Sequence, residues 1–256
     1  MAKRRPSASR YLPPQSAEEL LARYARGERR FPRAELHGAD LTVAKLSGAD
    51  LSRAKLSGAK LSDAKLSDAK LRGADLAEAD LTSADLTGAD LADAILISAT
   101  LTDAKLGGAD LSRADLYAAN LCSADIRNTR FDGARLGMTI FADVDLFQLC
   151  NADPPPVCEL ASFIDYHSMF ASVHIPASRL ENFLIRAGIP SAAAQYMINA
   201  ATVVRGSDWN MMRSTFVSYG SPDERFARKL YEALHRNRVR VFLFSEHAEP
   251  GEKSTG

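Results

Sequence analysis

Few side chains in this sequence have the types and spacing that catalysis or metal binding requires. His167 and His174 lie seven residues apart. A protein metal site needs more ligands than these two, so we interpret both as surface or packing residues. The cysteines Cys122, Cys150 and Cys158 form no spaced framework, which favours a reducing compartment over a disulfide scaffold. We find no glycine-rich phosphate loop and no Ser/His/Asp arrangement, and we therefore predict no catalytic residue and no metal ligand.

Composition narrows the class of protein. Lys and Arg together number 32, as do Asp and Glu, so net charge gives no pull toward nucleic acid or a membrane surface. No apolar run approaches the roughly 18 residues that a membrane-spanning helix needs. The basic start, Lys3 to Arg5, lacks the apolar stretch of a signal peptide. We expect a cytoplasmic protein without a membrane or nucleic-acid partner.

The elements that position every other side chain come from a repeat of five residues. From Phe31 to Leu146, each of the 24 positions spaced by five is large and apolar, and 20 of them are Leu. Two residues before each stands a small residue, and 20 of the 23 such positions from Ala34 to Val144 are Ala. The stretch is therefore one repetitive domain, predicted to span residues 31–150.

A period of five fits neither of the common regular structures. On an α-helix, successive leucines would drift around the axis by about 140°. On a flat strand they would alternate between the two faces, because five is odd. The pattern is satisfied if the chain turns a corner every five residues, so that each Leu and the preceding Ala point to one central axis.

The segments LSGAD, LSRAK, LTSAD and LTGAD resemble the motif of the pentapeptide-repeat family. The resemblance implies a mainly β fold, a right-handed quadrilateral β-helix with four pentads in each coil and about six coils. At about 4.8 Å between stacked strands, the rod would be roughly 29 Å long. Its core would be a ladder of leucines separated by alanines, with no room for a catalytic cavity. Representative members of this structural ladder are Leu46, Leu66, Leu86, Leu106, Ala64 and Ala84.

Charged residues are consistent with a coil of 20 residues. Read at intervals of 20, the position before each Leu gives four columns, and in three of them a Lys stands between acids. The fourth, Lys45, Lys65, Asp85, Lys105 and Asp125, begins with a like-charged pair. Opposite charges on neighbouring strands attract, so we interpret the columns as surface stabilisation, with a charge-patterned docking face as the alternative. The other three columns are Asp50, Lys70, Asp90 and Asp110; Asp40, Lys60 and Asp80; and Glu35, Lys55 and Asp75.

Segments with helical patterns flank the repeat. Residues 1–30 are predicted to be a tail and a capping helix, Ala17 to Arg26, in which Ser16 and Glu19 form a capping box. Looser repeats and the prolines at 154–156 are predicted to end the solenoid. Residues 151–213 are predicted to be a linker and a small helical bundle. Its three helices would carry Leu160, Phe163 and Ile164; Leu180, Phe183 and Leu184; and Tyr196, Met197 and Ile198.

The last segment, residues 214–256, has the texture of an α/β unit. Ser214 to Tyr219 is predicted to be a strand, followed by a helix and by a second, parallel strand over 239–244. TFVSYGSPD resembles the first conserved box of bacterial TIR domains, and the EPGE at 249–252 resembles their BB loop. The resemblance implies the first half of a flavodoxin-like TIR domain, which we expect to be truncated.

The TIR resemblance also carries expectations about sites. Tyr219, Gly220 and Ser221 match the wall of the family's nucleotide pocket, and Glu249, Pro250, Gly251 and Glu252 match its interaction loop. Many bacterial TIR domains hydrolyse NAD with a Glu on a later helix, which this sequence does not contain. We therefore expect no cofactor, because NAD would be used only by a complete TIR domain.

Three functions are consistent with these sequence patterns. The first is a non-enzymatic scaffold that carries a TIR-type segment for bacterial signalling or defence, with protein partners, homotypic TIR contacts and a homo-oligomer. The second is a truncated member of an NAD-hydrolysing TIR effector class. The third is a DNA mimic that interacts with gyrase, which the interspersed lysines of the repeat disfavour. We prefer the scaffold.

Overall fold

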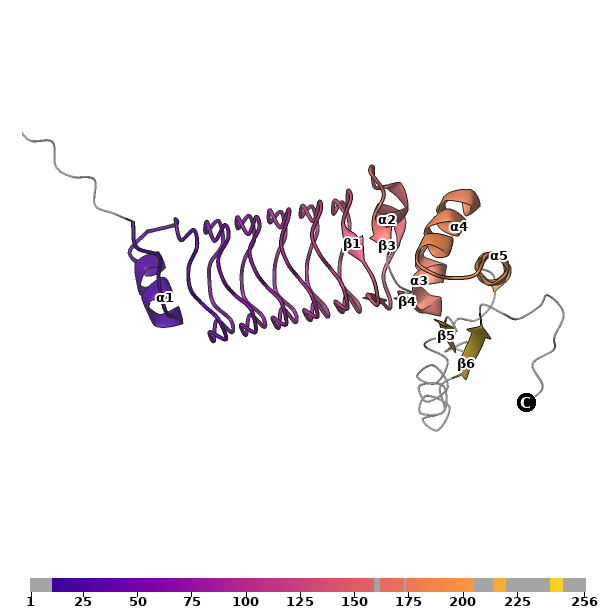
Figure 1. Ribbon diagram of the computed structural model, residues 1–256, viewed down its shortest axis with the longest axis horizontal. Coiled ribbons are helices and arrows are strands. Elements are labelled where there is room, and N and C mark those ends of the chain that lie inside the picture. Colours follow the sequence, from indigo (N-terminus) through magenta and orange to yellow (C-terminus); the bar gives the residue numbers. More distant parts are fainter. Residues whose placement is uncertain (1–10, 159–161, 173, 205–213, 220–239, 246–256) are drawn as a thin grey trace, which may run out of the picture.

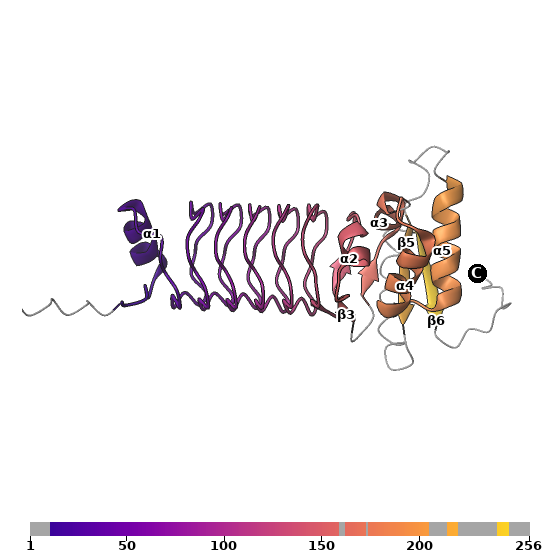
Figure 2. The same ribbon diagram turned by 90° about the horizontal axis from the view of Figure 1, so that it is seen from above.

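The protein is a capped rod. The computed structural model describes residues 11–158, 162–172, 174–204, 214–219 and 240–245. A helix stands at one end of a regular coil, and a group of short helices and strands stands at the other (Figures 1 and 2). None of the helices in these ranges is long and apolar enough to cross a membrane.

Each pentad makes one corner of the coil. In the pentad that begins at Leu61, the N–H of Ala64 donates to the carbonyl of Leu61 at 3.1 Å and closes the turn. The third residue, Asp63, has φ of +58°, the left-handed conformation that lets the chain turn. The N–H groups of Leu61 and Asp63 then donate to the next coil, to the carbonyls of Asp80 and Thr82.

The coil has four corners. Parallel bridges join residues 20 apart, from Arg30 and Asp50 at the start to Asn120 and Ile140 near the end. Because a corner occurs every five residues, a period of 20 gives four sides. The prediction of a pentapeptide coil is confirmed, and the charged columns stack as expected. Within one of them, Lys55 and Glu35 form an ion pair at 3.0 Å.

Asp before Leu completes the hydrogen bonding of a pentad. The residue after each Leu has an N–H that the ladder does not use, and where Asp or Asn precedes the Leu, its side-chain oxygen accepts this N–H. At Asp80, the Oδ1 atom accepts from the N–H of Thr82 at 3.0 Å and from its hydroxyl at 2.6 Å. The motif therefore prefers Asp or Asn there because a backbone donor needs an acceptor. The same bond recurs at Asp40, Asp50, Asp75, Asp85, Asp90, Asp110, Asp115, Asn120, Asp125 and Asp145.

The interior of the coil is filled with side chains. Leucines of the ladder and the alanines between them are almost completely buried, which at about 1.5–3 kcal/mol per buried Leu makes this column the main source of stability. Each of the representative ladder residues is at most 1% exposed, namely Leu46, Leu66, Leu86, Leu106, Ala64 and Ala84.

Helix α1, Ala17–Ala25, covers the first coil. The Ser16 hydroxyl caps it by accepting the N–H of Glu19, as predicted, but the Glu19 carboxylate accepts from Gln15 rather than completing the box on Ser16. Leu20 is fully buried, and the Tyr24 hydroxyl donates to the carbonyl of Ser47 at 2.9 Å. The open edge of the coil is thereby closed at this end.

The ladder continues beyond its expected end at residue 150. Strand β1, Arg135–Leu136, pairs in parallel with β3, Val157–Cys158, and β2, Ile140–Phe141, pairs with β4, Phe163–Ile164. The prolines at 154–156 therefore lie within a longer last coil and do not end it. The predicted helix through Phe163 and Ile164 is wrong, because these residues add a strand to the ladder, and Leu160 lies outside the described residues.

The last repeats are also tighter than their sequence indicates. Thr129 and Thr139 replace Ala in the pattern, yet they are 2% and 0% exposed. Each hydroxyl donates to a backbone carbonyl of the preceding coil, that of Leu106 at 2.7 Å and that of Leu116 at 3.0 Å. The predicted loosening is wrong at these positions, because a Thr hydroxyl is tolerated in the core when it is hydrogen bonded.

Helices close the second end. Helix α2, Phe147–Asn151, leaves the last repeat, and α3, Tyr166–Ala171, lies across the end of the coil. Ser168 in α3 and Ser172 directly after it accept the N–H groups of Val144 and Leu146, each at 2.9 Å, and all four residues are buried. The Ser172 hydroxyl thus replaces the next coil as the partner of Leu146, and the Ser168 hydroxyl accepts the N–H that closes the turn in the regular pentads.

Two further helices match the prediction closely. Helix α4, Ala177–Arg186, follows Pro176 and buries Leu180, Phe183 and Leu184. Helix α5, Ser191–Val204, buries Met197 and Ile198, whereas Tyr196 is 56% exposed. Beyond them, β5, Ser214–Tyr219, pairs in parallel with β6, Arg240–Ser245. The helix predicted between these two strands lies outside the described residues.

Candidate functional site: a pocket where the coil ends

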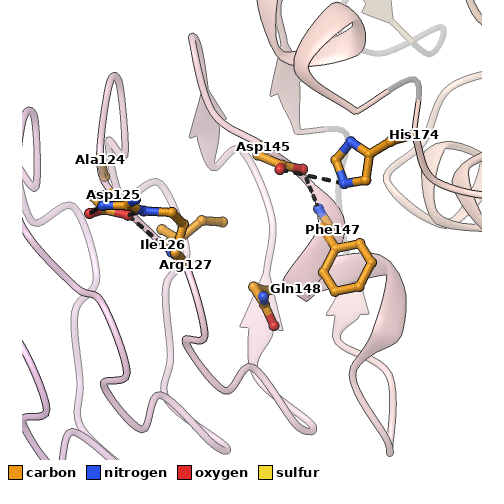
Figure 3. A pocket seen from close by; sticks show the side chains of 8 residues that line it. All are labelled: Ala124, Asp125, Ile126, Arg127, Asp145, Phe147, Gln148 and His174. Carbon is orange, nitrogen blue, oxygen red and sulfur yellow. Dashed lines mark hydrogen bonds and ion pairs between the residues drawn. The ribbon is translucent and has the colours of Figure 1, made fainter.

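A pocket opens between the last regular coil and the C-terminal helices. Its volume is about 450 Å³, and Figure 3 shows side chains from three segments that face it. The coil contributes one wall, the start of α2 the second, and the segment after α3 the third. The lining residues are Ala124, Asp125, Ile126, Arg127, Asp145, Phe147, Gln148 and His174.

The pocket exists because one bridged column stops. On this side of the rod, the bridges run through Lys45, Lys65, Asp85 and Lys105 to Asp125. Asp145 occupies the next place in the 20-residue register, but the chain leaves the coil at α2 two residues later. The interval between Asp125 and Asp145 is therefore open instead of being closed by strand pairing (Figure 3).

An ion pair forms the coil-side wall. The Arg127 guanidinium donates to both carboxylate oxygens of Asp125, at 2.8 and 2.6 Å. This hydrogen bonding lowers the pKa of Asp125 and raises that of Arg127. The Arg127 side chain is nevertheless 81% exposed, so the pair costs little to rearrange when a ligand approaches.

The opposite wall is built around His174. Its Nε2 atom lies 3.6 Å from a carboxylate oxygen of Asp145, and its ring stacks on Phe147 with 5.5 Å between the ring centroids. The Nδ1 atom lies 2.9 Å from the Ala171 carbonyl, a contact that requires a proton on Nδ1. Asp145 also accepts the N–H of Phe147 at 3.0 Å, which fixes the carboxylate at the start of α2.

This arrangement is suited to binding rather than to covalent chemistry. The lining offers one aromatic face, an amide and two carboxylates that already have basic partners, and it has no nucleophile. Within the described residues, no group of three or more His, Cys, Asp or Glu side chains could hold a metal ion. A lining with one aromatic face and a few polar groups is typical of a ligand-binding pocket.

A cysteine on α2, Cys150, is chemically quiet. Burial raises the pKa of the Cys150 thiol to about 12, and the charge of Asp145 acts in the same direction. Burial also raises the pKa of Cys158. Both thiols therefore remain protonated at neutral pH and are poor nucleophiles.

Of the residues predicted as sites from the TIR resemblance, only Tyr219 belongs to the described structure. Tyr219 is the last residue of β5. Gly220 and Ser221, together with the loop residues Glu249, Pro250, Gly251 and Glu252, lie outside the described residues. The ladder residues are interior positions, as described above.

Sequence reasoning missed the pocket. One signal was present, because Phe147 is a large aromatic at the outward position after Leu146, where most repeats carry Ser, Thr or Ala. His174 was interpreted as a surface or packing residue, and it is exposed and stacked. The contact between His174 and Asp145 depends on the path of the chain after the repeat, which has no periodic pattern.

The comparisons with known proteins concern the repeat. The family model of pentapeptide repeats matches the chain in eight copies, over residues 34–73, 59–96, 74–113 and 99–137. No curated protein matches the chain.

Several solved structures of pentapeptide-repeat proteins are similar to this chain. Rfr23 from the cyanobacterium Cyanothece 51142 is 27% identical over 47% of this chain and 95% of its own, with a TM-score of 0.40. A thylakoid-lumen protein from Arabidopsis thaliana is 29% identical over 45% of this chain and 77% of its own, with a TM-score of 0.34. A protein from Nostoc Pcc 7120 is 29% identical over 58% of this chain and all of its own, with a TM-score of 0.28.

Proposed function

We propose that this chain, whose residues 34–137 are pentapeptide repeats, is a non-enzymatic scaffold that presents a C-terminal interaction module at the end of a rigid rod. The observation that carries the proposal is the joint between the last repeats of the rod and the segment that contains α3. Ser168 in α3 and Ser172 directly after it are fully buried and accept backbone N–H groups of the last repeats, at Val144 and Leu146. Breaking these hydrogen bonds would leave buried donors unpaired, so the joint holds the C-terminal helices in a fixed orientation on the rod.

The interior supports the same role. Leu and Ala side chains fill the axis of the coil, so a ligand can reach only the outside of the rod or its ends. The pocket at Phe147 and His174 is lined by residues of the coil, of α2 and of the segment after α3. We infer that a protein partner inserts an apolar side chain there, against the stacked rings.

Residues 214–256 are the second part of the proposal. Ser214–Tyr219 and Arg240–Ser245 are paired in parallel, in the strand order of a TIR domain, which favours a TIR-type signalling segment. We infer homotypic contacts through the loop at 249–252. We infer a pocket wall that binds no cofactor at Tyr219, Gly220 and Ser221.

Two measurements test the function. Incubation of the full chain with NAD, beside an active TIR enzyme as positive control, should release no nicotinamide. Release of nicotinamide by the chain would favour the effector class and contradict a non-enzymatic scaffold.

The second measurement is capture of partners by the immobilised full chain. A partner that binds the wild type should be lost with Phe147→Ala and with His174→Ala. It should be retained with Tyr196→Ala, which removes an exposed ring on α5 outside the pocket. Equal capture by all four chains would remove the pocket from the proposal.

A further inference from the structure

One side of the rod changes character halfway along its length. Its last coils carry an apolar stripe, in which Ile95, Met138 and Val157 are 40%, 39% and 50% exposed. Ile97 and Tyr117 are half-buried between them. Bridges and strand pairing place Ile95, Asp115, Arg135 and Val157 in a single column, so the stripe lies on one flat side of the coil.

The same column is charged in the earlier coils. There it runs Glu35, Lys55 and Asp75, and the switch to apolar residues begins at Ile95. The interior of the coil is already filled by Leu and Ala, so these outward apolar side chains add nothing to its core. Five apolar side chains gathered on one side of the last coils are typical of a surface that protein covers.

Two charges stand at the centre of the stripe. An Asp115 carboxylate oxygen and an Arg135 nitrogen lie 2.6 Å apart, and the Arg135 guanidinium is 6.0 Å from the centre of the Tyr117 ring. Ile95 lies one coil before Asp115, and Val157 one coil after Arg135. The column therefore reads apolar, acidic, basic, apolar.

We propose that this side of the rod binds a second copy of the chain, with the two rods antiparallel and a two-fold axis between the levels of Asp115 and Arg135. That operation places the coil of Asp115 opposite the coil of Arg135 in the other copy. Asp115 then faces Arg135 of the second copy, and Ile95 faces its Val157. The sequence of the column is its own complement in this arrangement.

In the antiparallel arrangement, large side chains of one copy also face small side chains of the other. Met138, at a corner of the Arg135 coil, meets the level of Ala118 in the second copy. Tyr117 meets the level of Gly137, which leaves space for a ring. A parallel arrangement would instead place Asp115 on Asp115 and Arg135 on Arg135, which repel each other. The charge order thus selects the antiparallel dimer. The stripe includes none of residues 214–256, and the proposal does not depend on the scaffold role.

The test is a mixing experiment on full-length chains by sedimentation. Asp115→Arg gives a chain with two basic residues at the centre of the stripe, and Arg135→Asp gives one with two acidic residues there. Each variant alone should lose dimerisation, with a dissociation constant raised about tenfold or more by like charges. Mixed in equal amounts, the two should form a heterodimer, because the two basic residues of one chain then face the two acidic residues of the other.

The mixture separates the dimer from a structural role of the ion pair. Both variants lack the internal pair, so a loss caused only by local destabilisation would not be reversed by mixing. Tyr117→Glu should also abolish the dimer, whereas Thr87→Glu, on another side of the rod, should leave it unchanged. A wild-type chain that is monomeric at high micromolar concentration would overturn the proposal. A mixture of the two variants that stays monomeric would also overturn it.

Discussion

The Ser168 hydroxyl accepts the backbone N–H of Val144 at 2.9 Å, and both residues are buried. The same hydroxyl lies 2.6 Å from Asp165, whose carboxylate accepts its proton. Asp165 also accepts the N–H of Asp143 at 3.0 Å. One short hydrogen-bonded chain therefore joins the coil to α3 and stands in for the strand that a further coil would supply.

Removing this hydroxyl should weaken the joint. Ser168→Ala leaves the Val144 N–H without its acceptor, which costs about 1–3 kcal/mol in a buried site. We expect a lower urea midpoint and faster hydrogen exchange at Val144. Ser178→Ala, at an exposed position of α4, is the matched control and should change little. Equal stability of the two variants would show that α3 is held by its apolar contacts alone.

A second prediction concerns the corners. Val43 is 64% exposed and has φ of +54°, a conformation that strains a β-branched residue. Val43→Asn should raise stability by about 1 kcal/mol, because Asn tolerates this conformation. Thermal unfolding measures the gain. Gly48 occupies the same place in the next pentad, with φ of +67° and open space around it. Gly48→Val should therefore destabilise the rod, and a neutral result for both changes would contradict the strain argument.

The two parts of the chain differ in how much their sequences reveal. The coil could be predicted because one interaction, burial of Leu on the axis, repeats in step with one backbone corner. The end of the coil could not. Its pairings are 22 residues apart for Arg135 and Val157 and 23 for Ile140 and Phe163, which breaks the period. Phe163 and Ile164 are too few to define a helical or strand pattern, so pairing with β2 decides their structure.

The pocket follows from the same irregularity. Phe147 and His174 are far apart in sequence and meet because α2 and α3 replace the next coil. Neither helix has a repeat signature, and α2 contains only five residues. The charges at Asp125 and Asp145 fit the ordinary Asp-before-Leu pattern, so their residue types gave no hint of a binding surface.

Stability should depend on acid through Asp80. Hydrogen bonds from the hydroxyls of Thr82 and Ser62 lower the pKa of Asp80 below its ordinary value of 3.8. The ionised carboxylate therefore stabilises the fold, fully above about pH 4, and the contribution is lost as pH falls through the folded pKa. Thr82→Ala removes the largest cause and should move the pKa of Asp80 upward, as measured by carboxyl carbon NMR. An unchanged pKa in this variant would contradict the assigned cause.

The thiol of Cys150 should report opening of the C-terminal end. With a pKa of about 12, its thiolate fraction at pH 8 is on the order of one in ten thousand. We expect iodoacetamide to modify Cys150 slowly in the native chain and rapidly after unfolding in urea. Mass spectrometry of the peptide gives the rate. Ser168→Ala should speed the modification if α3 protects this end, and native labelling as fast as in urea would show that the thiol is not buried.

The separation of two labels on one side of the rod tests the central claim most directly. Thr42 and Ala142 are 100 residues apart in sequence but five coil steps apart in the bridged register. At about 4.8 Å for each step, the backbone separation should be roughly 24 Å. Spin labels at Thr42→Cys and Ala142→Cys, with Cys122, Cys150 and Cys158 replaced by Ser, would measure it by pulsed electron resonance. A narrow distribution near this distance is the predicted result. A broad distribution, or a distance approaching the roughly 150 Å of an α-helix of this length, would contradict the rigid coil.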